Sequence, residues 1–136
     1  MSKKKPRPTP VPAEPIPGLV DAHTHLASCG ARTQDEIDAV VGRAVVAGVE
    51  RICTVGDGLE EAKRALEAAH LNDRVFAACA IHPTRAHELG SDARAQLTRM
   101  AADTRCVAVG ETGLDYFRTG PEGHGVQQES FRWHID

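Results

Sequence analysis

The sequence has few aromatic residues, no long apolar run and no strong excess of charge of one sign. Phe, Trp and Tyr make up 4% of the 136 residues, whereas 41% are hydrophobic and 26% are charged, as in a globular domain. No run of about 18 apolar residues occurs, which excludes a membrane-spanning helix. The formal net charge of −3 is too close to neutral to indicate nucleic-acid binding by itself, although a local patch or a metal ion would still permit it.

Paired cysteine motifs are also absent. The four cysteines, Cys29, Cys53, Cys79 and Cys106, are widely spaced and form no CxxC pair, which argues against a zinc ribbon. No apolar segment typical of a signal peptide precedes them. We therefore expect free thiols in a reducing, cytoplasmic compartment. Cys53, Cys79 and Cys106 lie in apolar runs, and we expect them to be small buried side chains.

Residues 1–17 differ in composition from the rest of the chain. They contain six of the eight prolines, together with Lys3, Lys4, Lys5 and Arg7. Proline removes a backbone donor and restricts the preceding residue, so we expect this stretch to be a disordered basic tail. It is either a solvated extension or an arm that contacts nucleic acid. The folded domain is expected over residues 18–136.

Short apolar runs alternate with helical patterns along residues 18–136. Strands are predicted over 19–22, 51–55, 75–81 and 106–109. Helices are predicted over about 33–48, where Thr33 and Glu36 form a capping box, over about 59–70, from 91 onwards and from 126 onwards. Continuous apolar strands are typical of a parallel sheet covered on both faces. The pattern therefore predicts an α/β fold of about four βα units.

Polar side chains gather where the predicted strands end. In α/β proteins the active-site groups lie at the carboxyl ends of the strands, which favours an enzyme. Asp21, His23 and His25 close the first strand, and they point to one side because side chains alternate along a strand. Two imidazoles at this spacing can bind one metal ion. The alternative is that the histidines only form hydrogen bonds within a loop.

Glu111 and His82 follow two other strands. Glu111 lies between Gly110 and Gly113, which allow close approach of the backbone, and it can complete a His/His/carboxylate site or bridge two ions. Nitrogen and oxygen ligands favour zinc, manganese or magnesium. His82 precedes Pro83, which restricts its direction, so its imidazole can either bind an oxyanion such as phosphate or cap a helix.

Other polar residues carry weaker signals. Asp115 can orient a ligand or a water molecule, or it can form a turn. Gly56-Asp57-Gly58 is expected to form a tight turn rather than a phosphate-binding loop. The remaining histidines are expected at the surface: His70, His87, His124 and His134.

Four sequence blocks, in a fixed order, resemble those of one known family. They are Val20-Asp21-Ala22-His23-Thr24-His25, Ile81-His82-Pro83, Gly110-Glu111-Thr112-Gly113-Leu114-Asp115-Tyr116, and the late pair Gln127 and Phe131. The chain thereby resembles the TatD-type metal-dependent deoxyribonucleases, within the wider group of amidohydrolase-like TIM barrels. The resemblance begins at about Leu19 and is most specific in the third block.

The resemblance implies a metal centre and a nuclease reaction. His23, His25 and Glu111 would bind divalent metal (Mg, Mn or Zn), with Glu111 as the catalytic residue that bridges two ions in a complete site. His82 would bind a substrate phosphate, and Asp115 is a further substrate-binding candidate. Since metal ions lower the pKa of a bound water, the implied chemistry is phosphodiester hydrolysis. The implied substrate is DNA, single-stranded or at 3′ ends, cleaved in the manner of an exonuclease.

This sequence departs from the family pattern at three positions. Ala80 and Thr84 stand where the family often has glycine and histidine, and His134 stands where glutamine is common. The threonine argues against a second substrate-binding histidine in this region.

In this family, further metal ligands come from later strands of the barrel. A (β/α)8 barrel takes about 250 residues, so the 136 residues are expected to form its N-terminal half. Such a half exposes a sheet edge and apolar faces, and we expect it to be inactive or weak as a hydrolase. Two alternatives are a metal-dependent hydrolase of an ester, lactone or amide, and a non-catalytic half-barrel that self-associates.

Overall fold

The computed structural model describes residues 9, 11 and 13–136. Much of the predicted disordered tail (residues 1–8, 10 and 12) lies outside the described residues, and those described up to Ile16 form neither helix nor strand. The first regular element begins at Leu19, next to the predicted start of the domain.

Four strands form one parallel sheet in the order β1-β2-β3-β4. They are β1 (Leu19–Thr24), β2 (Val49–Val55), β3 (Val75–Ala78) and β4 (Cys106–Ala108). Each strand lies beside the one that precedes it in the chain, and a helix lies in every crossover, which is the arrangement of a (β/α)8 barrel. The predicted α/β fold is confirmed, and its four units correspond to half of such a barrel.

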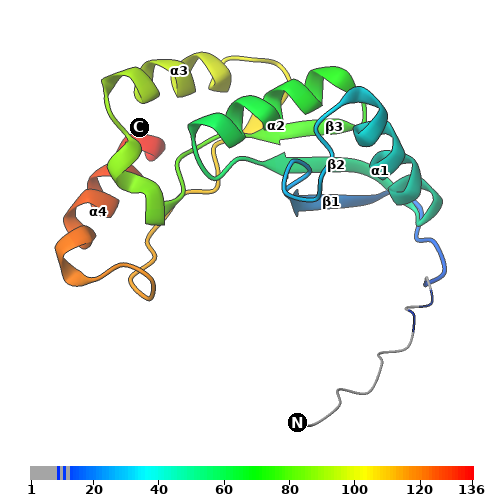
Figure 1. The fold of residues 1–136 in the computed structure, drawn as a ribbon, viewed down its shortest axis with the longest axis horizontal. Coiled ribbons are helices and arrows are strands. Elements are labelled where there is room, and N and C mark those ends of the chain that lie inside the picture. Colours follow the sequence, from blue (N-terminus) through cyan, green and yellow to red (C-terminus); the bar gives the residue numbers. More distant parts are fainter. Residues whose placement is uncertain (1–8, 10, 12) are drawn as a thin grey trace, which may run out of the picture.

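Three helices cover one face of the sheet (Figure 1): α1 (Gln34–Val46), α2 (Leu59–Leu71) and α3 (Ser91–Ala101). The side of α2 that faces the core consists of small residues, so this helix packs closely against β2 and β3. The core between the helices and the sheet includes Ile37, Val41, Ala62, Ala65, Ala68, Ala69, Leu97, Ile52, Val75 and Ala77.

The predicted capping box begins α1. The Thr33 hydroxyl accepts a hydrogen bond from the Glu36 amide at 3.4 Å, and the Glu36 carboxylate accepts one from the Thr33 amide at 3.0 Å. After the helix, Gly48 has a φ of 94°, which favours glycine. A Cβ at Gly48 would also lie 2.7 Å from the Ile16 nitrogen. This glycine therefore lets the segment before β1 pass close to the end of α1.

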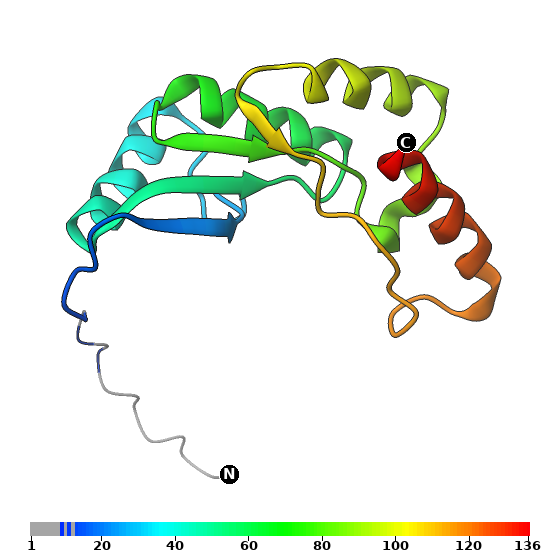
Figure 2. The same ribbon diagram turned by 180° about the vertical axis from the view of Figure 1, so that it is seen from behind.

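Two element boundaries differ from the sequence prediction by more than two residues. β3 ends at Ala78, and the apolar residues 79–81 continue as a buried segment outside the sheet. A 3-10 helix, η1 (Pro83–Glu88), follows this segment. The last helix, α4 (Pro121–Ile135), begins before the predicted start near residue 126. It lies beyond the carboxyl ends of the strands and packs against η1 (Figure 2).

The other face of the sheet carries no helix among the described residues (Figure 2). Apolar side chains of the two edge strands are exposed there and at the edges, with 53% of Val20 and 56% of Val107 accessible. The predicted exposure of apolar surface is thus confirmed. Within the described part of the chain, every helix is too short or too polar to cross a membrane.

All four cysteines are unpaired. Cys79 is buried, as predicted, whereas Cys53 and Cys106 are only partly buried and Cys29 is exposed. Cys106 is less buried than expected because it lies on β4, which has no strand on its outer side among the described residues.

Candidate metal centre

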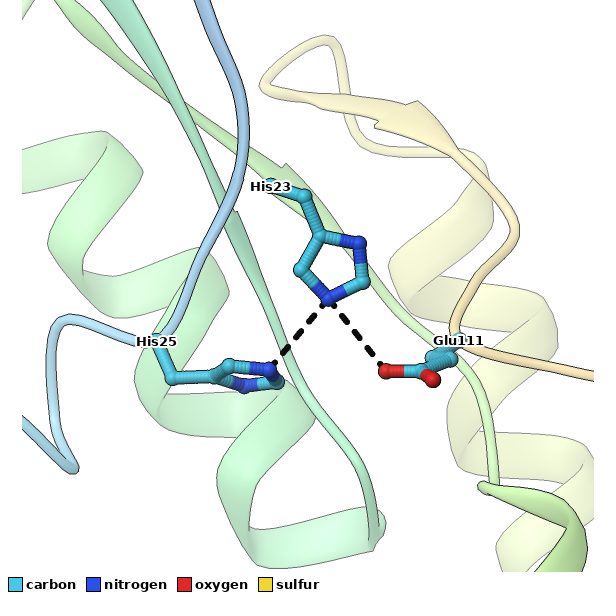
Figure 3. Close-up of side chains that lie close together, drawn as sticks. All are labelled: His23, His25 and Glu111. Carbon is cyan, nitrogen blue, oxygen red and sulfur yellow. Dashed lines mark hydrogen bonds and ion pairs between the residues drawn. The ribbon is translucent and has the colours of Figure 1, made fainter.

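His23 and His25 come together at the carboxyl end of β1 (Figure 3). Their Nε2 atoms are 3.3 Å apart, so both imidazoles point to one place, as the alternation of side chains predicts. Between Asp21 and Thr24 the pairing of β1 with β2 shifts in register. In this irregular stretch the Asp21 carboxylate accepts a hydrogen bond from the His23 amide at 3.1 Å. The bond stabilises the backbone that presents the two rings.

A backbone contact orients the His25 ring. Its Nδ1 lies 2.8 Å from the carbonyl oxygen of Val55, the last residue of β2. A carbonyl can only accept, so Nδ1 carries the proton and Nε2 keeps its lone pair. Histidine ligands of metals are commonly held in this way, through a hydrogen bond from the second ring nitrogen. His25 Nε2 is therefore ready to bind a cation.

Glu111 completes a group of three potential metal ligands. It follows β4, and its Oε2 lies 3.3 Å from His23 Nε2 (Figure 3). One potential ligand atom from each of His23, His25 and Glu111 lies within 4.8 Å of the others. Ligands about 2.1 Å from a common ion are spaced about 3.0–3.4 Å apart, which matches the two 3.3 Å separations. Two imidazoles and a carboxylate also have the donor chemistry that zinc, manganese and magnesium accept, so the residues fit a divalent ion.

His82 approaches the same carboxylate from the other side. Its Nε2 is 3.4 Å from Glu111 Oε1, and 19% of its side chain is exposed. Its Nδ1 accepts a hydrogen bond from the Thr84 amide at 3.2 Å, and the Thr84 hydroxyl is 2.7 Å away. The proton of a neutral His82 is therefore on Nε2. A protonated Nε2 can donate to an oxyanion but cannot bind a metal ion, which separates His82 from the candidate ligands His23 and His25.

Asp115 lies in the turn after Glu111, and its carboxylate is bound by Arg118. Its two oxygens accept hydrogen bonds from the Arg118 amide and guanidinium, both at 2.9 Å. These bonds hold the pKa of Asp115 below its ordinary value. Of the two sequence-based alternatives for Asp115, the turn-forming one describes these contacts.

Gln127 is a residue whose role the sequence did not reveal. It is 1% exposed, and it spans from α4 to the segment after Glu111. Its Oε1 accepts from the Asp115 amide at 2.8 Å, and its Nε2 donates to the Thr119 hydroxyl at 2.7 Å and to the Asp115 carbonyl at 3.3 Å. Gln127, Ser130 and His134 lie at helical spacing and form a polar stripe on one face of α4. This spacing was the signal in the sequence that these polar side chains share a face of the helix.

His134 is half-buried, contrary to the expectation that it lies at the surface. Its Nε2 is 3.1 Å from the Ile81 amide and its Nδ1 is 2.7 Å from the Ser130 carbonyl. Burial lowers the pKa of His134. His124 is also half-buried and stacks on Tyr116, whereas His70 and His87 are exposed as predicted.

The Gly56-Asp57-Gly58 stretch is a turn that leads into α2, and it is filled by Arg85. The Arg85 guanidinium occupies the space where a Cβ at Gly58 would lie. It forms ion pairs with Glu61 at 2.9 Å and with Glu88 at 2.7 Å, and these carboxylates raise its pKa. The stretch is therefore a packed turn whose neighbouring arginine is already paired with carboxylates, in agreement with the tight-turn prediction.

Comparison with known proteins gives the family of the chain. The family described as TatD related DNase has a model that matches residues 20–136. The chain is 51% identical over 123 residues to an uncharacterized metal-dependent hydrolase TatD of Mycobacterium tuberculosis, covering 87% of this chain and 46% of that protein. It is 32% identical over 81 residues to a Cronobacter sakazakii protein named 3′-5′ ssDNA/RNA exonuclease TatD, covering 60% of this chain and 31% of that protein.

Two solved structures share the fold. The TatD homologue YJJV of Escherichia coli superimposes with a TM-score of 0.71 at 28% identity, over 86% of this chain and 45% of that one. A TatD family hydrolase of Entamoeba histolytica gives a TM-score of 0.75 at 23% identity, over 89% and 46% of the two chains. The chain thus spans about half the length of the relatives that it matches. It belongs to the TatD-related DNase family of metal-dependent hydrolases.

Proposed function

We propose that this chain supplies the first half of the active site of a divalent-metal-dependent nuclease that hydrolyses phosphodiester bonds in DNA. The observation that carries the proposal is the convergence of His23, His25 and Glu111 within 4.8 Å at the carboxyl end of the sheet. The proposed substrate is a single strand or a 3′ end. It is supported by the exonuclease name of the Cronobacter relative.

Each ligand has a separate role in the proposed site. His23 and His25 hold the cation through Nε2, and Glu111 is both a ligand and the catalytic carboxylate. When bound, a divalent ion of the Mg, Mn or Zn class supplies Lewis-acid polarisation and activates water near neutral pH. The two oxygens of Glu111 face different partners, His23 and His82. If the complete site holds two ions, a bridging role for Glu111 would require its Oε1 to turn from His82 to the second ion.

His82 is the proposed substrate-binding residue. Its protonated Nε2 points at the metal-site carboxylate, where it can donate to a phosphate oxygen of the bound strand. Asp115 acts on the substrate indirectly, by holding the turn that follows Glu111. Together these residues orient the phosphate beside the ion, and the orientation contributes to the rate because the reacting groups are held in place.

The test is hydrolysis of a 3′-labelled single-stranded oligonucleotide with Mg²⁺ or Mn²⁺. We expect weak or no cleavage by this chain, since it spans about half of the related proteins. We expect cleavage once the chain replaces the matched 46% of the Mycobacterium tuberculosis relative. Glu111→Ala should abolish that cleavage, and His70→Ala, which removes an exposed histidine outside the site, should leave it unchanged.

Two results would count against the proposal. Strong cleavage by the chain alone, lost in Glu111→Ala, would show that the second half is not required. Hydrolysis of esters, lactones or amides by the chimera, without cleavage of DNA, would favour the other substrate class.

Self-association of the half-barrel is a second candidate function. It is supported by the exposed apolar residues Leu19 and Val20 on one edge strand and Val107 on the other. Sedimentation would show a dimer that dissociates in Val107→Asp. A folded monomer at all concentrations would exclude this function. We also propose a cytoplasmic location, supported by the four unpaired cysteines.

A further inference from the structure

Helix α4 contacts both of the strand-end segments that bear the site. Gln127 binds the backbone at Asp115, in the segment that follows Glu111. Seven residues further along the helix, His134 binds the amide of Ile81, the residue directly before His82. One rigid helix therefore spans the two segments that bring Glu111 and His82 face to face.

The contacts of His134 define one protonation state of its ring. Nδ1 lies 2.7 Å from the Ser130 carbonyl, which can only accept, so Nδ1 carries a proton. Nε2 lies 3.1 Å from the Ile81 amide, which can only donate, so Nε2 has a lone pair. The ring is thus neutral, and it is an acceptor for a backbone donor on another element.

The Ile81 amide depends on this acceptor. Ile81 is 0% exposed and lies outside β3, so neither water nor a neighbouring strand replaces the histidine. Two nearby amides are bound elsewhere: Cys79 donates to the Ala108 carbonyl at 3.2 Å and His82 to the Asp57 carbonyl at 3.1 Å. The segment between β3 and η1 is therefore held from three directions, and His134 provides the contact from α4.

We propose that His134 is a positioning residue for His82. By accepting the Ile81 amide, it sets the backbone from which the His82 ring reaches Glu111 at 3.4 Å. The importance of this role for catalysis rests on the proposed function, because His82 is there the group that donates to the substrate phosphate. The positioning itself is a property of the folded chain and requires neither metal nor DNA.

The experiment is NMR of the metal-free chain, with amide exchange and ¹⁵N-histidine spectra. We compare His134→Gln, whose side-chain oxygen still accepts, with His134→Leu, which has no acceptor. His124→Leu is the matched control, because His124 lies on the same helix and contacts Thr119 and Tyr116 instead. In His134→Leu the Ile81 amide should exchange about tenfold faster, or about 1.4 kcal/mol, since a buried donor loses its partner. The His82 ring signals should shift from the Nε2-protonated form in the same variant.

His134→Gln should keep both signals close to those of the unmodified chain, and so should His124→Leu. The proposal is overturned if His134→Leu behaves as the unmodified chain, if the glutamine and leucine variants are equally perturbed, or if His124→Leu reproduces the effect. Should His134→Leu not fold, unchanged His82 signals in His134→Gln support the proposal and altered ones overturn it. Because metal and DNA are left out, a failed cleavage assay of the chimera would refute the proposed function without affecting this result.

Discussion

Replacing Gln127 tests how the segment that follows Glu111 is held in place. Gln127→Leu keeps the approximate size of a 1% exposed side chain but removes its three hydrogen bonds to Asp115 and Thr119. Leaving a buried polar group unpaired costs about 1–3 kcal/mol, and the partners here are partly accessible to water, so we take the lower value for each bond. The expected loss is about 3 kcal/mol, which lowers the Tm of a domain of this size by about 10 °C.

Thermal and urea unfolding of Gln127→Leu and Gln128→Leu measure this loss. Gln128 is the adjacent residue on α4 and makes a single hydrogen bond, to the Tyr116 hydroxyl at 2.8 Å. Its replacement should cost less than about 1 kcal/mol. Affinity for Mn²⁺ should fall in Gln127→Leu, because the backbone after Glu111 is released, and should persist in Gln128→Leu. Equal effects of the two substitutions would refute the role of Gln127 in holding the segment after Glu111.

Three further predictions concern individual side chains. His82→Ala should leave the affinity for Mn²⁺ unchanged and weaken binding of a non-cleavable oligonucleotide, because Nε2 of His82 is protonated and faces the Glu111 carboxylate as a donor. Calorimetry measures both affinities, and lost metal binding would contradict the role of His82 as a donor to the substrate. Burial lowers the pKa of His134 from its ordinary value of 6.5, so the folded chain binds fewer protons than the unfolded one in that range. Its contribution to stability is complete above pH 6.5 and is lost as the pH falls through the lowered pKa. Urea unfolding from about pH 8 to about pH 5 should show the free energy of unfolding decrease with falling pH, and the decrease should be smaller in His134→Gln. A hydrogen bond from the Cys79 thiol lowers the pKa of Cys106 to about 7, whereas the pKa values of Cys53 and Cys79 are raised. Mass spectrometry after mild alkylation at neutral pH should therefore find Cys106 modified before Cys53 and Cys79.

The sequence was sufficient for the fold because its strands and helices have distinct periods. The apolar runs at β1, β2 and β4 and the helical spacing after Thr33 match elements of the structure. The run through Ile81 misled the prediction of β3, because residues 79–81 are buried beyond the end of the strand, although the Cys79 amide still donates to Ala108 of β4. A buried strand and a buried irregular segment have the same apolar composition.

The start of α4 was missed for a related reason. Gly123 and Gly125 weaken the helical pattern in its first turns, so the periodicity becomes clear only from Val126. Pro121 at the first turn was the available signal, since proline is favoured there.

The convergence of the candidate metal ligands was more predictable than the contacts that support it. His23, His25 and Glu111 come from strand ends that a parallel sheet must bring to one edge, so the sequence order alone places them together. Gln127 and His134 act through pairings with Asp115 and Ile81, which lie 12 and 53 residues away in the chain. Such long-range pairings depend on how α4 packs, and no local pattern specifies that packing.

Metal binding by His23, His25 and Glu111 is the most direct test of the proposed function. Calorimetric titration with Mn²⁺ should show binding to the unmodified chain and an affinity at least tenfold lower, or about 1.4 kcal/mol, in His23→Ala and Glu111→Gln. His70→Ala is the matched control, because His70 pairs with Asp103 at 2.9 Å outside the site, and it should bind as the unmodified chain does. Equal affinity in Glu111→Gln and the unmodified chain would contradict the assignment of this site.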